Sequence, residues 1–330
     1  MADDYSKSLD TQIEELQKKE KRLNKLVALC SIMLLGMFII IIISSIFQIQ
    51  IQIPVLRKAV ILWGVFWFAA LMIFLIKYDN SVKNLRSMMA KNIGIEGILN
   101  QYLDVELFDP ERSVDKEIVY AAGIGHWGYG HNYIKGKINN VGIETSYVHI
   151  DEGNDGPFWY RGQLSYLKNK RRFPEKVLLI RKGNYRKYGI GIHYYEVLPC
   201  KLDGSPKSFI DSLRERDRLF IDSLKERDRE QYRVIITGGQ LEDQWEVFST
   251  DKDIARQILA PRTELHRRLL NSPRLAFVLY SDDNIYFGGN YYFDLTKGSP
   301  EEVRANVEKA MDGLINEGVG TVLSGGMEYL

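Results

Sequence analysis

Residues 26–47 read LVALCSIMLLGMFIIIIISSIF, and residues 59–76 read AVILWGVFWFAALMIFLI. Neither run contains a charged side chain. A helix needs about 20 consecutive apolar residues to cross a hydrocarbon core about 30 Å thick. Each run is long enough, so together they predict a two-helix transmembrane hairpin over 26–76, with an external link at 48–58. A cleaved signal peptide does not fit, because its apolar region is only about 7–15 residues long.

Basic residues flank this hairpin on one side of the membrane. The link carries only Arg57 and Lys58. Because cytoplasmic flanks carry an excess of Lys and Arg, we predict a multi-pass protein of the bacterial inner membrane with both termini in the cytoplasm. Neither run contains an ionisable side chain that would indicate an ion path, so the hairpin is expected to be an anchor. The flanking cations are Lys18, Lys19, Lys21, Arg22, Lys25, Lys77, Lys83, Arg86 and Lys91.

The composition excludes several classes of function. The 330 residues carry a formal net charge of +1, so no overall positive charge draws the protein to nucleic acid. Cys30 and Cys200 are the two cysteines. They cannot form a disulfide framework or a zinc site of several thiolates, which agrees with a reducing compartment. Phosphate-binding and nucleophile-elbow motifs are missing from the sequence, so we assign no catalytic residue, metal or cofactor.

The N-terminal arm, residues 1–25, predicts an amphipathic helix because Leu9, Ile13, Leu16 and Leu23 recur near helical spacing. Two interpretations remain open. The arm forms a short coiled coil with a second copy, as in an oligomeric membrane assembly, or it is a solvated lead-in to the first span. After the second span, residues 77–103 predict a connecting helix.

Residues 104–330 predict one soluble domain of the α+β class, with a mixed or antiparallel sheet and flanking helices. Alternating residues from Lys135 to Ile150, centred on Asn139-Asn140, predict a β-hairpin. The segment from Gly318 to the end is expected to be loosely held. Further strands are expected at 158–166, 176–181, 192–198, 233–237, 275–280, 284–287 and 291–295. Helices are expected at 250–259, 263–270 and 301–317.

A duplicated charged helix is expected at residues 209–229. FIDSLRERDR occupies 209–218 and FIDSLKERDR occupies 220–229, a period of 11 residues. Eleven residues are three helical turns, so the repeated phenylalanines share one face. The pattern fits a solvated helix with a narrow apolar seam, or a site for a partner helix.

A segment rich in glycine and histidine follows residue 122. Gly123, Gly125 and Gly128 match G-x-G-x-x-G, but the residues after them predict a strand rather than the helix that a dinucleotide site needs. We therefore interpret the segment as a turn. His126, His131 and His149 could converge on a metal, although no standard ligand spacing is present. An enzyme with an unrecognised site near this turn is the alternative to a binding module.

Basic residues interleaved with aromatic residues dominate 161–187, which we name the basic segment. Such a segment can contact anionic lipid headgroups, an acidic protein or, with less support, nucleic acid. It can also be a solvated face of a strand. The candidate binding residues are Arg161, Lys168, Lys170, Arg171, Arg172, Arg181, Lys182, Arg186 and Lys187.

The soluble part resembles a bacterial family known as domain of unknown function 3137. The resemblance rests on FWYRG at 158–162, LEDQWEVFSTD at 241–251 with ARQILAP at 255–261, and NIYF at 284–287 followed by Phe293. It covers roughly residues 85–297 and implies a membrane hairpin ahead of the domain, with Val247 and Phe248 ending a strand and no established activity. The duplicated helix and Ala260, where the family commonly has a hydroxyl residue, depart from the pattern.

These patterns together favour a non-enzymatic role. We predict a membrane-tethered cytoplasmic interaction module that binds a protein partner or the anionic membrane surface.

Overall fold

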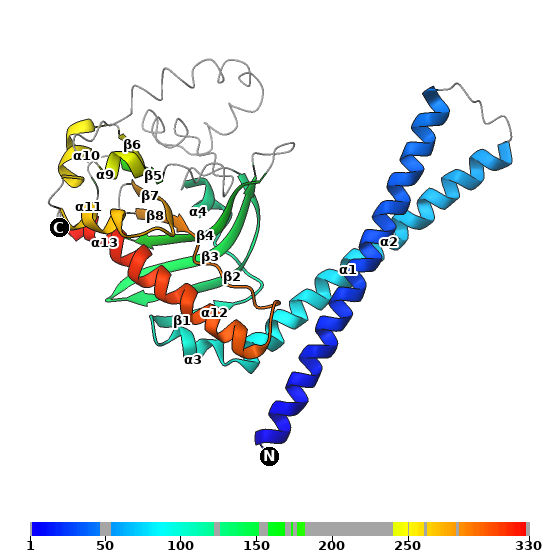
Figure 1. Ribbon diagram of the computed structural model, residues 1–330, viewed down its shortest axis with the longest axis horizontal. Coiled ribbons are helices and arrows are strands. Elements are labelled where there is room, and N and C mark those ends of the chain that lie inside the picture. Colours follow the sequence, from blue (N-terminus) through cyan, green and yellow to red (C-terminus); the bar gives the residue numbers. More distant parts are fainter. Residues whose placement is uncertain are drawn as a thin grey trace. The chain divides into compact units, whose positions relative to one another are not determined.

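The computed structural model describes residues 2–46, 54–121, 126–151, 158–168, 173, 177–181, 240–249, 251–260, 263–281 and 284–327 (Figure 1). The chain forms two compact units. The first comprises Met1–Gly94 with Asp294–Val303, and the second comprises Ile95–Phe293 with Arg304–Leu330.

The first unit is built on two long helices, α1 (Ala2–Ile46) and α2 (Pro54–Asn92), which pack against each other and run in opposite directions (Figure 1). Ile13 and Leu23 of α1 are buried in this unit, as are Leu85 and Met89 of α2. The Gln17 side chain donates a hydrogen bond to the Gly298 carbonyl oxygen at 3.0 Å. The apolar seam of the N-terminal arm is therefore used inside the chain.

The predicted connecting helix, 77–103, is wrong as a single element. Helix α2 ends at Asn92, and Gly94 has a φ of +62°, a left-handed conformation that suits glycine at a helix end. A short helix, α3 (Ile95–Leu99), follows, and β1 begins at Asp104.

The second unit contains one eight-stranded antiparallel sheet, which confirms the α+β prediction. The strand order is β1-β2-β3-β4-β8-β7-β5-β6, so β8, the last strand along the chain, lies beside β4. The strands are β1 (Asp104–Asp109), β2 (His126–Ile138), β3 (Val141–Asp151), β4 (Phe158–Lys168), β5 (Val177–Arg181), β6 (Trp245–Ser249), β7 (Leu275–Ser281) and β8 (Asn284–Gly289).

The predicted hairpin at 135–150 is confirmed. Ile138 pairs with Val141, which leaves a two-residue turn at Asn139-Asn140. These residues have φ values of 50° and 66°. Positive φ at both positions is the requirement of a type I′ turn, and asparagine tolerates it better than most residues.

One face of the sheet packs beneath α4 (Lys116–Ala121). Its core contains Tyr133, Val148, Leu164 and Leu279, together with Val119 from α4. The Tyr133 hydroxyl donates to the Glu144 carboxylate at 2.8 Å. Burial and this carboxylate raise the pKa of Tyr133, so the phenol stays neutral at physiological pH.

Two short helices before β7 begin with side-chain caps. The N-caps of α10 (Lys252–Ile258) and α11 (Glu264–Leu270) confirm the two predicted helices. The Asp251 carboxylate accepts from the backbone N–H groups of Asp253 and Ile254, and Thr263 Oγ1 accepts from that of His266. The remaining helices are α9 (Gln240–Gln244) and α12 (Pro300–Gly313).

The prediction of a loose C-terminal tail is wrong. After α12, a π-helical segment (Leu314–Val319) and α13 (Gly320–Met327) continue the helical path, and Val319 and Val322 are buried. The glycines that suggested a loose tail allow close packing instead. A Cβ on Gly318 would lie 2.6 Å from the Phe287 ring of β8.

One predicted strand is wrong, and two elements were not predicted. Residues Tyr291–Leu295 do not form a strand, because the chain leaves the sheet after Gly289 and Asn290 bonds back to the Arg274 carbonyl oxygen. Strand β1 and helix α4 were not predicted. The predicted strands at 192–198 and 233–237 and the duplicated helix at 209–229 lie outside the described residues.

Candidate functional site

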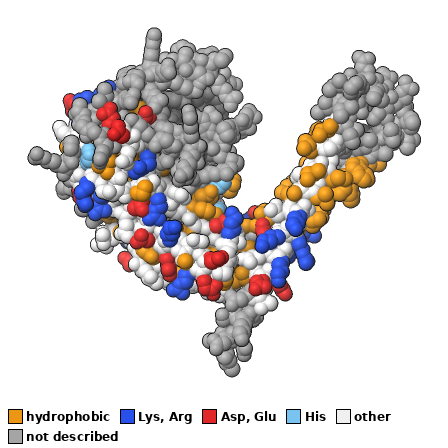
Figure 2. Space-filling model, viewed as in Figure 1, with side chains coloured by type: hydrophobic (Ala, Val, Ile, Leu, Met, Phe, Trp, Pro, Cys, Tyr) orange, Lys and Arg blue, Asp and Glu red, His pale blue; other side chains and the backbone are white. Residues whose placement is uncertain are grey.

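An exposed apolar surface covers much of the α1–α2 pair, and we name it the apolar band (Figure 2). Phe66 and Phe68 on α2 are 63% and 58% exposed, and Ile32 on α1 is 65% exposed. Soluble proteins rarely expose a contiguous apolar surface of this kind. The band comprises Leu26, Leu29, Ile32, Met33, Leu35, Phe38 and Ile39 on α1, and Leu62, Trp63, Val65, Phe66, Phe68, Met72, Ile73, Leu75 and Ile76 on α2.

Two small residues are buried within the stretch of α1 and α2 that carries the apolar band. Cys30 of α1 is 1% exposed, and Gly64 of α2 is also buried. The two buried residues here are therefore small, whereas the bulky side chains of the apolar band are exposed and Leu34, Trp67 and Phe74 are half-buried. This arrangement is the reverse of a water-soluble helix pair and is typical of helices that pack within lipid.

Within the described part of the chain, one helical segment, Leu62–Asn92, is long and apolar enough to cross a membrane. The first predicted span, in α1, is not identified by the same criterion. Side chains of α1 beyond Ile39 lie outside the description, so the two-span hairpin remains a prediction.

A second candidate site lies on β2 and β3, where two histidines meet three tyrosines. The Tyr129 ring stacks on His149 with centroids 4.1 Å apart, and Tyr147 lies 4.9 Å from both His149 and His131. Tyr292 completes the group at 4.1 Å from Tyr147. We name these five residues the aromatic–histidine cluster.

Strand register explains how the cluster assembles. Tyr129 pairs with His149 and His131 pairs with Tyr147, across a bulge-containing stretch of the β2–β3 ladder. Tyr147 and His149 are two residues apart on β3 and thus share a face. Tyr292 comes from the loop after β8.

Buried polar groups lie beside the cluster on neighbouring strands. Thr145 and Ser165 have hydroxyl oxygens 2.7 Å apart, and Gln163 donates to the Thr145 hydroxyl at 2.9 Å. Asn132 adopts a φ of 58° and its amide donates to the Phe293 carbonyl oxygen at 3.0 Å. All four residues are almost fully buried. This polar interior is unusual in a sheet core, and it fixes the loop that carries Tyr292.

The cluster brings together two of the three predicted histidines. His131 and His149 are both buried and share Tyr147 as a neighbour. The ladder pairs His126 with Asp151, but the side chains of these two residues are outside the description. Among the described side chains, no group of three His, Cys, Asp or Glu residues could hold a metal ion. Imidazole and phenol groups can still bind a ligand through hydrogen bonds and stacking.

The basic segment is described at three of its candidate residues. Lys168 is exposed at the end of β4, Arg161 lies in β4 with its side chain outside the description, and Arg181 ends β5. The other six, Lys170, Arg171, Arg172, Lys182, Arg186 and Lys187, fall outside the described residues.

Arg181 has a structural role that the sequence did not indicate. Its guanidinium donates to the carbonyl oxygens of Leu275, Leu269 and Ser272 at 2.8–3.1 Å. It also lies over the Trp245 ring, 4.8 Å from the centroid. Burial lowers the pKa of Arg181, but the guanidinium remains charged because the ordinary pKa of arginine lies far above physiological pH. Arg181 therefore joins β5, β6 and the loop before β7 and does not offer a free surface charge.

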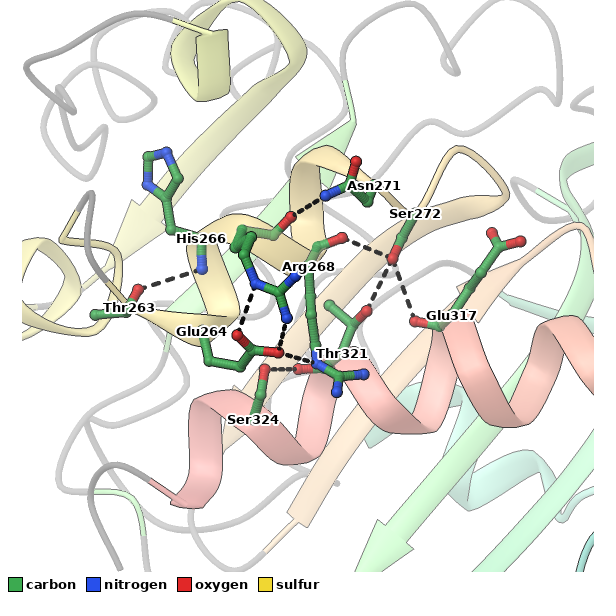
Figure 3. Close-up of polar contacts among 10 residues, drawn as sticks. Thr263, Glu264, His266, Arg268, Asn271, Ser272, Glu317, Thr321 and Ser324 are labelled. Atoms are coloured by element: carbon green, nitrogen blue, oxygen red, sulfur yellow. Dashed lines mark hydrogen bonds and ion pairs between the residues drawn. The ribbon is translucent and has the colours of Figure 1, made fainter.

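A network of polar side chains holds α13 and the π-helical segment before it in place (Figure 3). The Ser272 hydroxyl lies 2.8 Å from both the Arg268 carbonyl oxygen and the Thr321 hydroxyl. Arg274 donates to the Glu317 carboxylate at 2.7 Å and to the Lys309 carbonyl oxygen at 3.1 Å. These contacts attach α13 and the π-helical segment to the loop before β7, so they support the fold rather than a reaction.

Sequence reasoning did not identify Tyr129, Tyr147 or Tyr292 as site residues. The alternation of residues on β3 could have placed Tyr147 beside His149, because they are two positions apart. Nothing in the sequence shows that Tyr292, more than 140 residues further along the chain, folds back onto them.

Comparison with known proteins does not place the chain in a family. No protein-family model matches it, and no curated protein matches it. The chain is similar to the crystal structure of the mycobacterial trehalose monomycolate transport factor A, TtfA, with 13% sequence identity over 70% of this chain and 95% of that chain. The TM-score is 0.31, which is too low to establish a shared fold or function.

Proposed function

We propose that the protein is a membrane-tethered interaction module of the bacterial inner membrane. Helices α1 and α2 form a two-span anchor, both termini lie in the cytoplasm, and the sheet domain binds a protein partner or the anionic membrane surface. The observation that carries this proposal is the apolar band.

The apolar band is large enough to make transfer of the helix pair from water into lipid favourable. Seven large apolar side chains on α1 and nine on α2 are exposed. Moving one such side chain out of water contributes about 1.5–3 kcal/mol. These side chains are 37–69% exposed, so a hydrocarbon environment would stabilise the helix pair by roughly 10–25 kcal/mol relative to water on this scale. No element of the described chain covers these side chains.

Self-association through the N-terminal arm has less support. Ile13 and Leu23 would form the seam of a coiled coil, but they are 2% and 7% exposed within one chain. A second copy would have to displace α2 from this surface.

Membrane insertion can be tested by alkaline carbonate extraction of cell membranes. We expect the full-length protein to stay in the pellet. Phe66→Arg with Phe68→Arg should shift it to the supernatant or cause its degradation, because each arginine near a span centre costs about 2.5–3.5 kcal/mol. Leu107→Arg is the matched control, since Leu107 is an exposed apolar residue of β1. Release of the unmodified protein by carbonate would refute the anchor.

The interaction role needs a separate experiment. We would purify the full-length protein in mild detergent and identify co-purifying proteins by mass spectrometry, alongside Arg171→Glu with Arg172→Glu. We expect this variant to lose a stoichiometric partner or to lose liposome binding. Lys116→Glu with Lys309→Glu, on exposed lysines of α4 and α12, controls for charge reversal. Unchanged partners and unchanged liposome binding would refute a role for the basic segment.

The aromatic–histidine cluster supports a second candidate function, a small-molecule or metal-dependent activity. His131 and His149 are buried beside three tyrosines, which is an uncommon concentration of groups that can transfer or share protons. Metal analysis of the purified full-length protein tests the metal-dependent form. Stoichiometric metal that His149→Gln removes would favour it, and its absence from the unmodified protein would exclude it.

A further inference from the structure

Exposed cations lie where the apolar band ends. On α1, Lys25 directly precedes Leu26, the first residue of the band, and on α2, Lys77 directly follows Ile76, its last residue. Two more exposed cations lie within one helical turn before Lys25. We name the four residues Lys21, Arg22, Lys25 and Lys77 the basic collar.

Helix pairing brings the cations of both helices to one level. The Tyr78 side chain forms a hydrogen bond with the Glu20 carboxylate, which fixes the register of the two helices. Because the helices run in opposite directions, Lys77 lies at about the same height as Lys21. With a rise of 1.5 Å per residue, Lys25 lies about 6 Å closer to the centre of the band. The collar therefore lies at the depth at which lipid headgroups would lie.

The collar carries a net positive charge that nearby acids offset only in part. Adjacent cations on the same helices are paired: Lys18 with Glu14 at 3.4 Å, and Lys83 with Asp79 at 2.6 Å. Glu20 is the acid within the collar, and it offsets one of the four positive charges, since a hydrogen bond from the neutral Tyr78 phenol leaves the carboxylate charged. Among the described residues, none of the four collar cations forms an ion pair.

We infer that the basic collar binds the phosphate groups of anionic phospholipids, an inference that rests on the proposed membrane anchor. Arg22 can hold a phosphate with two parallel hydrogen bonds, since its guanidinium is a planar fork. The three lysines supply point charges on flexible stems, and Lys25 can extend its stem along the apolar band to reach the headgroups. Each cation near an anionic surface increases the binding constant about fivefold. The collar is thus a lipid-selective site as well as a marker of orientation.

Native mass spectrometry of the full-length protein tests this inference. The protein is incorporated into nanodiscs of phosphatidylcholine and phosphatidylglycerol at a ratio of 4:1, released into detergent, and its bound lipids are counted. We expect bound phosphatidylglycerol to be enriched at least fivefold over the bulk ratio. The collar variant, Lys21→Gln, Arg22→Gln, Lys25→Gln and Lys77→Gln together, should bind the two lipids in the bulk ratio.

The matched control removes four positive charges elsewhere, with Lys91→Gln, Lys116→Gln, Lys252→Gln and Lys309→Gln. On α2, Lys91 is about 22 Å along the helix from the end of the band, beyond the screening length of about 10 Å in physiological salt. This variant should keep the enrichment. Bulk-ratio binding by the unmodified protein, or equal loss in both variants, would overturn the lipid site while leaving the anchor intact. Failure to enter nanodiscs would overturn the anchor, and the site with it.

Discussion

At the residue scale, single side chains of this protein perform roles that their type alone does not reveal. Arg181 belongs by sequence to a basic segment, yet its guanidinium satisfies three backbone carbonyl oxygens. A lysine has one ammonium group and cannot reproduce this fork of hydrogen bonds. Glu264 is a half-buried residue, and its carboxylate is paired with two arginines on its own helix.

Substitution of Arg181 should destabilise the sheet domain. Arg181→Leu leaves three carbonyl oxygens without this donor, so we expect a loss of about 2–4 kcal/mol in the free energy of unfolding. Arg181→Lys should lose about half as much. Trp245 lies beneath the guanidinium and is one of five tryptophans, so the change in tryptophan fluorescence of the full-length protein in detergent, compared between variants, follows the transition. Lys168→Leu, at an exposed position, should change the stability by less than about 0.5 kcal/mol; an equal effect of both substitutions would contradict the assigned role.

The ion pairs of Glu264 predict a pH-dependent contribution to stability. Hydrogen bonds from Arg267 and Arg268 lower the pKa of Glu264 to about 2. A carboxyl with a lowered folded-state pKa contributes stability that is present above its unfolded pKa, about 4.5, and is lost as the pH falls towards the folded value. The stability difference between the unmodified protein and Glu264→Gln should be constant above pH 5 and shrink between pH 4.5 and about 2. A difference that stays constant down to pH 2 would contradict the role of these ion pairs.

At the scale of single elements, glycine and asparagine decide several features by their backbone preferences. Asn139-Asn140 closes the β2–β3 hairpin, and Gly94 ends α2. Gly318 acts through its missing side chain, because its helix lies close to β8. The first two roles are local and readable from sequence, whereas the third depends on a strand about 30 positions away.

The β2–β3 turn should respond to substitution as a type I′ turn. Asn140→Gly should stabilise the protein by up to about 1 kcal/mol, because glycine adopts positive φ without steric cost. Asn140→Val should destabilise it by about 1–2 kcal/mol, the cost of a left-handed conformation for a residue with a Cβ branch. Thermal unfolding of the two variants shows whether each substitution raises or lowers the stability. Stabilisation by valine would rule out the turn.

Two glycine-to-alanine substitutions should have opposite effects. Gly318→Ala should destabilise the protein by about 1–3 kcal/mol, because its Cβ would overpack against Phe287. Gly97→Ala, in α3, meets no atom within 4 Å and should stabilise by about 0.5–1 kcal/mol through helix propensity. Equal effects of the two in a denaturant titration would show that the π-helical segment does not pack closely on the sheet.

At the scale of the whole molecule, the chain divides into a helical unit with an apolar exterior and a sheet unit with an apolar interior. Bulky apolar residues are exposed on α1 and α2. In the sheet unit, by contrast, Phe248, Phe277 and Phe287 are fully buried. This contrast supports the proposal that the protein works at a membrane surface.

The proposed orientation leads to a prediction for the whole chain. A fluorescent protein fused to the C-terminus should be bright, and alkaline phosphatase at the same position should be inactive, because only the cytoplasm suits the first and only the periplasm suits the second. Phosphatase inserted in the link at 48–53 should be active. Active phosphatase at the C-terminus would show that the sheet domain is exported and that the hairpin is inverted or has a single span.

The sequence by itself determined features that depend on neighbouring residues. Two uncharged runs predicted apolar helices, Asn139-Asn140 predicted the hairpin, and Asp251 and Thr263 marked helix starts, because length, backbone preference and capping act within a few residues. Only the tertiary structure decided that β8 lies beside β4, that Arg181 is an internal ligand of carbonyl oxygens, and that Tyr292 reaches His131 and Tyr147. It also showed that a glycine-rich tail is a buried helix. These features come from contacts between residues far apart in the chain, where close packing and hydrogen-bond satisfaction outweigh local preference.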